Sequence, residues 1–150
     1  KNFGIIYYDL KDYTKSIINY KKAIELGQAD YFPMVYHDLA ESQKKIKKYY
    51  DAIYNYKKTI QLLESKSEIA HLNNDIGLVK VIMGDYEMAI QNFREAVEHH
   101  SEIPEYTYNL GISLIQSKSN INEGEKLIKK AKKLATSSNI ILGENIDLIK

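Results

Sequence analysis

Residues 76–96 read IGLVKVIMGDYEMAIQNFREA, and this stretch decides the fold. Apolar residues recur at helical spacing on both sides of Gly84 and Asp85. A helix can end at such a glycine, and the next helix can begin with the aspartate as its cap. Small residues stand at Gly77 and Ala89, each close to large apolar neighbours. Small side chains let helix backbones approach closely, so the stretch predicts two tightly packed antiparallel helices.

The same arrangement occurs four times, at intervals of 34 to 37 residues. Every copy holds Gly, Ala, Ser or Thr at three equivalent positions. The twelve small residues are Gly4, Ala40, Gly77 and Gly111 in the first helices, and Ser16, Ala52, Ala89, Gly124, Ala23, Thr59, Ala96 and Ala131 in the second helices. Large residues precede the first-helix positions: Phe3, Leu39, Ile76 and Leu110. A helical unit copied at this period indicates a stacked solenoid.

Helical periodicity covers nearly the whole chain, and its two prolines and seven glycines leave little room for hairpins. We expect helices near residues 2–10, 13–26, 33–46, 50–64, 68–83, 86–99, 104–117, 121–135 and 139–150. Several residues suit helix starts: Asp12 and Asp85 as caps, Asn120 with Glu123 as a capping box, and Pro33 and Pro104 in first turns. The connections are short, so neighbouring helices should run antiparallel.

The sequence therefore predicts an all-α chain with a single array over residues 1–150. The expected repeats are near 1–30, 33–66, 68–101 and 104–137, followed by a terminal helix at 139–150. The chain begins with Lys1, and its last expected helix has no partner after it. We expect it to be a piece of a longer protein.

Composition excludes several function classes. A net charge of +1 gives no general reason to bind nucleic acid, and no apolar run approaches the length that crosses a bilayer. The absence of cysteine excludes disulfides and thiolate chemistry. No phosphate-binding glycine loop or nucleophile elbow is present. We expect no enzymatic activity, cofactor, metal, nucleic-acid partner or membrane insertion, and a cytoplasmic location.

These features resemble a tetratricopeptide-repeat array. The third repeat carries the likeness best, with Ile76-Gly77, Gly84-Asp85-Tyr86, Ala89, Phe93 and Ala96. Gln43 and Lys80 depart from it, because the family usually has an aromatic residue at those positions. The resemblance implies a right-handed superhelical solenoid whose first helices line a concave groove.

The resemblance also implies which residues would contact a partner in that groove. They are His37, Asp38, Glu41, His71, Asn74, Asp75, Glu105, Tyr108, Asn109 and Ile112, with Tyr8 and Lys44 as further positions. The best-known family ligand ends in a carboxylate held by Lys, Asn and Arg. Asp38 and Asp75 would repel that carboxylate, so a peptide or protein surface with basic and apolar character fits better.

Two other clusters admit a chemical reading. His37 and His71 with nearby carboxylates could hold a divalent metal or transfer protons, but no close-spaced metal motif is present. Two lysine clusters, at residues 44–48 and 126–133, invite a phosphate-binding interpretation. A solvated helix face explains the lysines more simply.

The leading hypothesis is a non-catalytic scaffold that binds a peptide or protein partner in the groove. The alternative is a regulatory sensor domain of a bacterial signalling protein, such as a peptide-responsive regulator or a histidine kinase. A third possibility is self-association through the apolar ends of the array.

Overall fold

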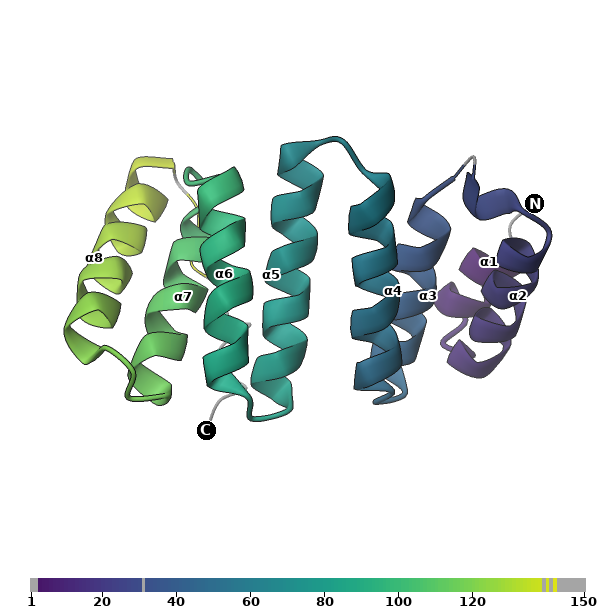
Figure 1. Ribbon diagram of the computed structural model, residues 1–150, viewed down its shortest axis with the longest axis horizontal. Helices are drawn as coiled ribbons and strands as arrows, with labels where there is room; N and C mark the ends of the chain where they lie inside the picture. The colour runs from purple at the N-terminus through teal and green to yellow at the C-terminus, as the bar shows by residue number, and fades with distance from the viewer. Residues whose placement is uncertain (1–2, 31, 139, 141, 143–150) are drawn as a thin grey trace. The chain divides into compact units, whose positions relative to one another are not determined.

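A computed structural model describes residues 3–30, 32–138, 140 and 142 (Figure 1). Its described residues form α-helices, one short 3₁₀ helix and no strand. The chain divides into two compact units, unit 1 over residues 1–64 and unit 2 over residues 65–150.

The helices agree with the expected ones to within a few residues. Unit 1 holds α1 (Phe3–Asp9), α2 (Tyr13–Glu25), the 3₁₀ helix η1 (Gln28–Asp30), α3 (Met34–Lys45) and α4 (Tyr49–Leu62). Unit 2 holds α5 (Lys66–Ile82), α6 (Tyr86–His99), α7 (Pro104–Gln116) and α8 (Ile121–Ser138). The sequence analysis did not anticipate η1. The helix expected at 139–150 lies outside the described residues.

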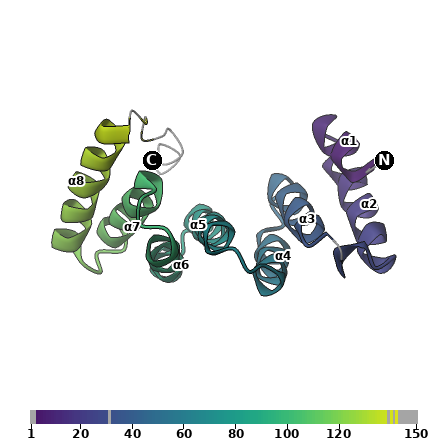
Figure 2. The same ribbon diagram turned by 90° about the horizontal axis from the view of Figure 1, so that it is seen from above.

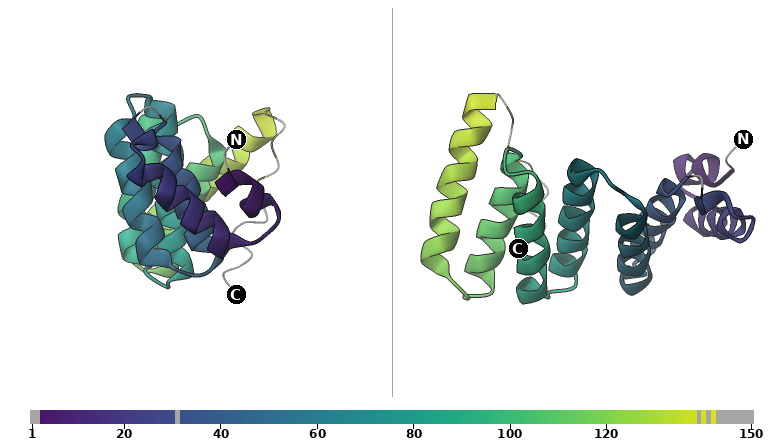
Figure 3. Two further views of the ribbon diagram at one scale, coloured as in Figure 1. Left: turned by 90° about the vertical axis from the view of Figure 1, so that its right-hand side faces the viewer. Right: turned by 45° about the horizontal axis from the view of Figure 1, so that its top comes forward.

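Within unit 2 the helices follow one another in chain order, and each packs on the next (Figure 2). The turned view in Figure 3 shows α7 and α8 as neighbouring antiparallel helices. In unit 1, α2 packs on α1 and α3, and α3 packs on α4. The predicted all-α stack of helix pairs is confirmed within each unit.

Most expected helix ends are present. The Asp12 and Asp85 carboxylates accept hydrogen bonds from backbone N–H groups three residues later, at 3.1 and 3.2 Å. Asn120 and Glu123 bond to each other through their side chains, and the Glu123 N–H donates to Asn120 Oδ1. Pro104 begins α7 as expected, whereas Pro33 precedes the first residue of α3 and occupies its cap position. The Pro33 expectation was therefore off by one residue.

The small positions bring the helices close together, and all twelve are buried. A methyl group built on Gly77 would lie 2.5 Å from Cε1 of Phe93, whose side chain is fully buried. Gly111 and Gly124 face each other, so a methyl group on either would meet the other's carbonyl oxygen within 2.8 Å. These contacts explain why the pattern tolerates only small residues there.

The large residues are mostly in the core, with one exception. Tyr20, Tyr56 and Phe93 are buried, and so are Leu39, Ile76 and Leu110, which precede the small first-helix positions. Phe3 is 58% exposed, so the expectation that it packs like its equivalents was wrong. Among the described helices, α1 packs chiefly against α2, and the ring of Phe3 lies largely outside that contact. None of the described helices has the length and apolarity needed to cross a membrane.

Candidate partner-binding surface

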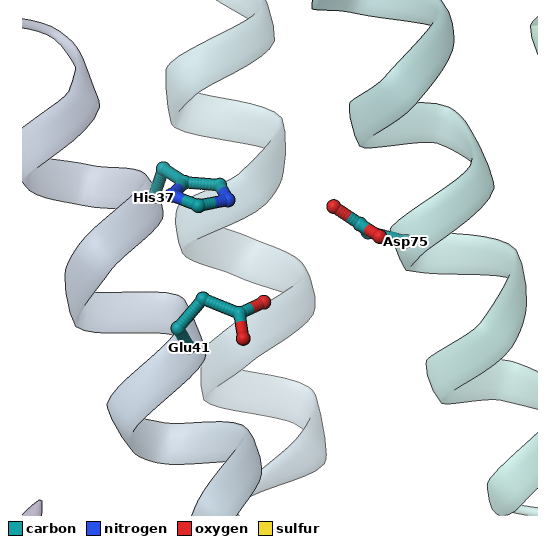
Figure 4. Close-up of side chains that lie close together, drawn as sticks. All are labelled: His37, Glu41 and Asp75. Atoms are coloured by element: carbon teal, nitrogen blue, oxygen red, sulfur yellow. The ribbon is translucent and has the colours of Figure 1, made fainter. Parts of the chain in front are cut away.

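The middle of α3 carries three of the expected contact residues in unit 1. His37 and Glu41 lie one helical turn apart and project from the same side of α3 (Figure 4). Asp38 lies next to them, with its Oδ1 3.3 Å from Nδ1 of His37. All three side chains are partly exposed, and Asp38 is the most accessible at 33%. They are reachable from solvent but held by neighbours.

Glu41 is the best-anchored of these groups. Its carboxylate accepts hydrogen bonds from the Tyr56 hydroxyl and from Nζ of Lys44, the latter at 2.6 Å. Burial alone would raise the pKa of Glu41, but Lys44, Tyr56 and His37 together outweigh burial and lower it. The Lys44 ammonium also lies 5.8 Å from the centre of the Tyr56 ring. The ring of Tyr56 is buried in the core, and its hydroxyl adds a second role by holding Glu41.

Two further tyrosines approach the same carboxylates in unit 1. The pKa of the buried Tyr20 is raised, first by burial and then by the charge of Asp38 and a hydrogen bond to it. The pKa of Tyr8 is also raised, by burial and then by Glu41 and other nearby groups. Both tyrosines thus lie close enough to the carboxylates of α3 for the negative charge to disfavour their ionisation.

In unit 2, polar contacts join the successive first helices α5 and α7. Nδ2 of Asn109 donates to Oδ1 of Asn74 at 2.7 Å, and both residues are buried. The Tyr106 hydroxyl lies 3.5 Å from Nδ1 of His71. These contacts bind the two helices side by side, so the structure gives Asn74 and Asn109 a role in helix packing.

The remaining expected residues of unit 2 are accessible to different degrees. His71 is 62% exposed at its side chain, and its Nε2 lies 3.5 Å from the more buried carboxylate of Asp75. Glu105, Tyr108 and Ile112 are half-buried on α7. Burial, followed by the charges of Asp75 and Glu105, raises the pKa of Tyr106. Tyr106 was not expected at this surface, because an aromatic residue at that position has the pattern of a core residue.

The structure also explains the two departures from the family pattern. Gln43 is buried and its Oε1 accepts a hydrogen bond from Asn55 at 2.8 Å. One repeat later, Nζ of Lys80 donates to Oδ1 of Asn92 at 2.7 Å. In both repeats, the polar residue of the first helix thus bonds to an asparagine of the second helix. The two asparagines occupy equivalent positions in their repeats. A buried polar group that keeps a partner avoids most of its desolvation cost.

The residues considered for metal binding belong to both units. His37 and Glu41 are in unit 1, whereas His71 and Asp75 are in unit 2. Within each unit, one imidazole nitrogen lies 3.3 to 3.5 Å from a carboxylate oxygen on the same helix. Such pairs suit contacts with polar or cationic groups of a partner.

Residues 2–29 and 70–98 each match the family model for the tetratricopeptide repeat. These two stretches are tetratricopeptide repeats. The two matched stretches contain the first helix pair and most of the third, where the small positions and capping aspartates are clearest. The predicted resemblance is confirmed.

Solved structures show the same fold. The crystal structure of MamA aligns with a TM-score of 0.79 and 21% identity, over 91% of this chain and 76% of that chain. MamA from position 41 to its end, from Desulfovibrio magneticus RS-1, gives 0.75 and 21%, over 89% and 72%. BtubC from P. vanneervenii gives 0.78 and 15%, over 91% and 62%. No curated protein matches this chain in sequence. Identities this low establish the helical-repeat fold and nothing more specific.

Proposed function

We propose that this tetratricopeptide-repeat chain is a non-catalytic scaffold that binds a peptide or protein partner along its first helices. Scaffolds of this fold generally serve protein–protein interaction, because stacking repeats the same helical positions in rows. The preferred partner segment is basic and apolar. Each unit offers such a segment its own carboxylates, on α3 in unit 1 and on α5 in unit 2.

One observation carries this proposal: acidic side chains on the first helices are held in place yet still reachable. Asp38 and Asp75 each lie beside a histidine on the same helix, and Asp38 also takes a hydrogen bond from Tyr20. Side chains fixed before binding lose little conformational entropy when a partner arrives. Half-buried Tyr108 and Ile112 supply apolar surface on α7 in unit 2.

A peptide-display selection on the purified 150-residue chain tests the proposal. Lysine- or arginine-rich peptides with apolar residues should be enriched, and their affinity is then measured by fluorescence anisotropy. Asp38→Asn and Asp75→Asn should each weaken binding by about fivefold to tenfold, since each removes one charge contact. Asp51→Asn and Glu87→Gln are the matched controls, because they remove the same charge from exposed second-helix positions.

Two outcomes would contradict the proposal. One is enrichment of acidic peptides, which carry the wrong charge for these helices. The other is a control substitution that weakens binding as much as Asp38→Asn and Asp75→Asn do, because net charge alone would then explain the effect.

A further inference from the structure

Helix α8 carries more lysines than any other described helix, and they lie on its outward side. Five lysines lie within eight residues: Lys126, Lys129, Lys130, Lys132 and Lys133. All five are exposed. Four of them, all but Lys132, share one side because positions three, four and seven residues apart lie on one helix face. We call these four residues the α8 lysine face.

This face is opposite the surface that α8 uses for packing. The buried residues of α8 are Gly124, Ala131 and Ala135, and Gly124 lies directly against Gly111 of α7. The larger apolar residues of α8 lie on or beside the packing side, where Leu127, Ile128 and Leu134 are half-buried. The α8 lysine face itself presents no apolar residue that could insert into a bilayer, so attachment through it would be electrostatic.

Counter-charges are scarce around the α8 lysine face. Over the residues that the structure describes, none of the five lysines forms an ion pair. The two acidic residues of α8 are Glu123 and Glu125, and Glu123 is paired with Arg94 at 2.9 Å. Unpaired like charges this close repel one another, so a polyanionic surface would relieve that repulsion.

We propose that the α8 lysine face adsorbs onto an anionic lipid surface and holds the scaffold against it without insertion. A helix lying flat touches a plane along one side, and the face spans about 10 Å at 1.5 Å per residue. Lysine is a compact hydrated charge that suits a fluid array of headgroups, whereas arginine suits paired contacts with fixed phosphates. Helix α8 contains no arginine, and it contains no aromatic residue on which nucleic-acid bases could stack. These features favour lipid over nucleic acid.

Vesicle sedimentation tests the proposal directly. The purified 150-residue chain is mixed either with vesicles of phosphatidylcholine alone or with vesicles in which phosphatidylserine replaces about 30% of the phosphatidylcholine. We expect binding only to the anionic vesicles, and loss of binding at about 0.5 M salt, where charges are screened over a few ångströms. Each lysine near an anionic membrane surface raises the partition coefficient onto that surface about fivefold. The triple variant K126Q/K129Q/K133Q should therefore bind about 100-fold more weakly.

A matched variant separates the α8 lysine face from overall charge. K21Q/K22Q/K57Q removes three exposed lysines from α2 and α4 in unit 1 and changes the net charge equally. It should retain nearly full binding to anionic vesicles. Circular dichroism melts of both triple variants should match the parent, because none of the six side chains is buried.

Three results would overturn the proposal. The first is no binding of the parent chain to phosphatidylserine vesicles at low salt. The second is an equal loss of binding in both triple variants, which would make net charge the cause. The third is tight binding to duplex DNA or polyglutamate that depends on Lys126 and Lys129 while vesicles are ignored, which would assign the face to another polyanion.

Discussion

Replacing Gly77 with alanine tests whether close helix approach is what the repeated small positions provide. The new methyl group would lie 2.5 to 2.8 Å from three ring atoms of Phe93, nearer than atoms pack in proteins. The ring is fully buried and cannot swing into solvent, so the helices must move apart. Overpacking of this kind costs about 3 kcal/mol at the upper end of its usual range.

The same substitution also brings a benefit that must be subtracted. Alanine is favoured over glycine inside a helix by about 1 kcal/mol. The net expectation for Gly77→Ala is thus a loss of about 2 kcal/mol in the free energy of unfolding. Urea denaturation followed by circular dichroism at 222 nm measures it. A domain of this size would melt about 4 to 8 °C lower.

A second background shows whether the ring of Phe93 is the cause. In a chain carrying Phe93→Leu, the ring atoms near Gly77 are gone, so Gly77→Ala should be neutral or stabilising there. The two substitutions should therefore be non-additive by about 2 kcal/mol. The reasoning is refuted if Gly77→Ala stabilises the parent chain, or if it costs the same in both backgrounds.

Three further predictions concern backbone strain, acid stability and a buried polar network. Lys47 has a left-handed φ of 62°, so Lys47→Gly should raise the free energy of unfolding by about 1 kcal/mol, and an unchanged urea midpoint would contradict this. Glu41 has a folded pKa below its unfolded value near 4.5, so its stabilisation is present above about pH 4.5 and is lost as the pH falls further. Thermal melts from pH 3 to 7 should show Glu41→Gln destabilised at pH 7 and converging with the parent in acid; a constant difference would refute this. Asn92→Ala removes hydrogen bonds to Lys80 and Asn73 and should cost about 2 to 3 kcal/mol by urea denaturation, whereas a loss below about 0.5 kcal/mol would show the network to be unimportant.

The repeated positions were predictable because packing restricts them in every copy. Gly77, Ala89 and Ala96 are small for one physical reason, and that reason acts on each equivalent position in the chain. Helix starts were predictable for a similar reason, since Asp12 and Asp85 each satisfy a free N–H group. Phe3 departs from the pattern because α1 packs chiefly against α2, and this ring remains 58% exposed.

The candidate surface was less predictable, because a helical position alone does not specify side-chain partners. The sequence pattern placed Asn74 and Asn109 with the contact residues, yet they are buried and bond to each other between α5 and α7. Glu41 was expected at the surface, but its partner Tyr56 comes from the following helix and could not be inferred from spacing. Contacts between helices depend on side-chain direction, which periodicity does not encode.

The turns between paired helices show how a backbone requirement can remain hidden in a sequence. Gly84 has a φ of 84°, and Lys11, Lys47 and Lys118 hold equivalent places with φ between 58° and 62°. All four residues follow the first helix of a pair and let the chain reverse before the second helix begins. Only the glycine signals that geometry in the sequence, because lysine is ordinary at a helix end. The requirement is nevertheless the same in each repeat, so copying the helix pair also copied the left-handed turn. The left-handed backbone conformation costs about 1 kcal/mol at each lysine, and the packed helices on both sides of the turn hold the backbone in it.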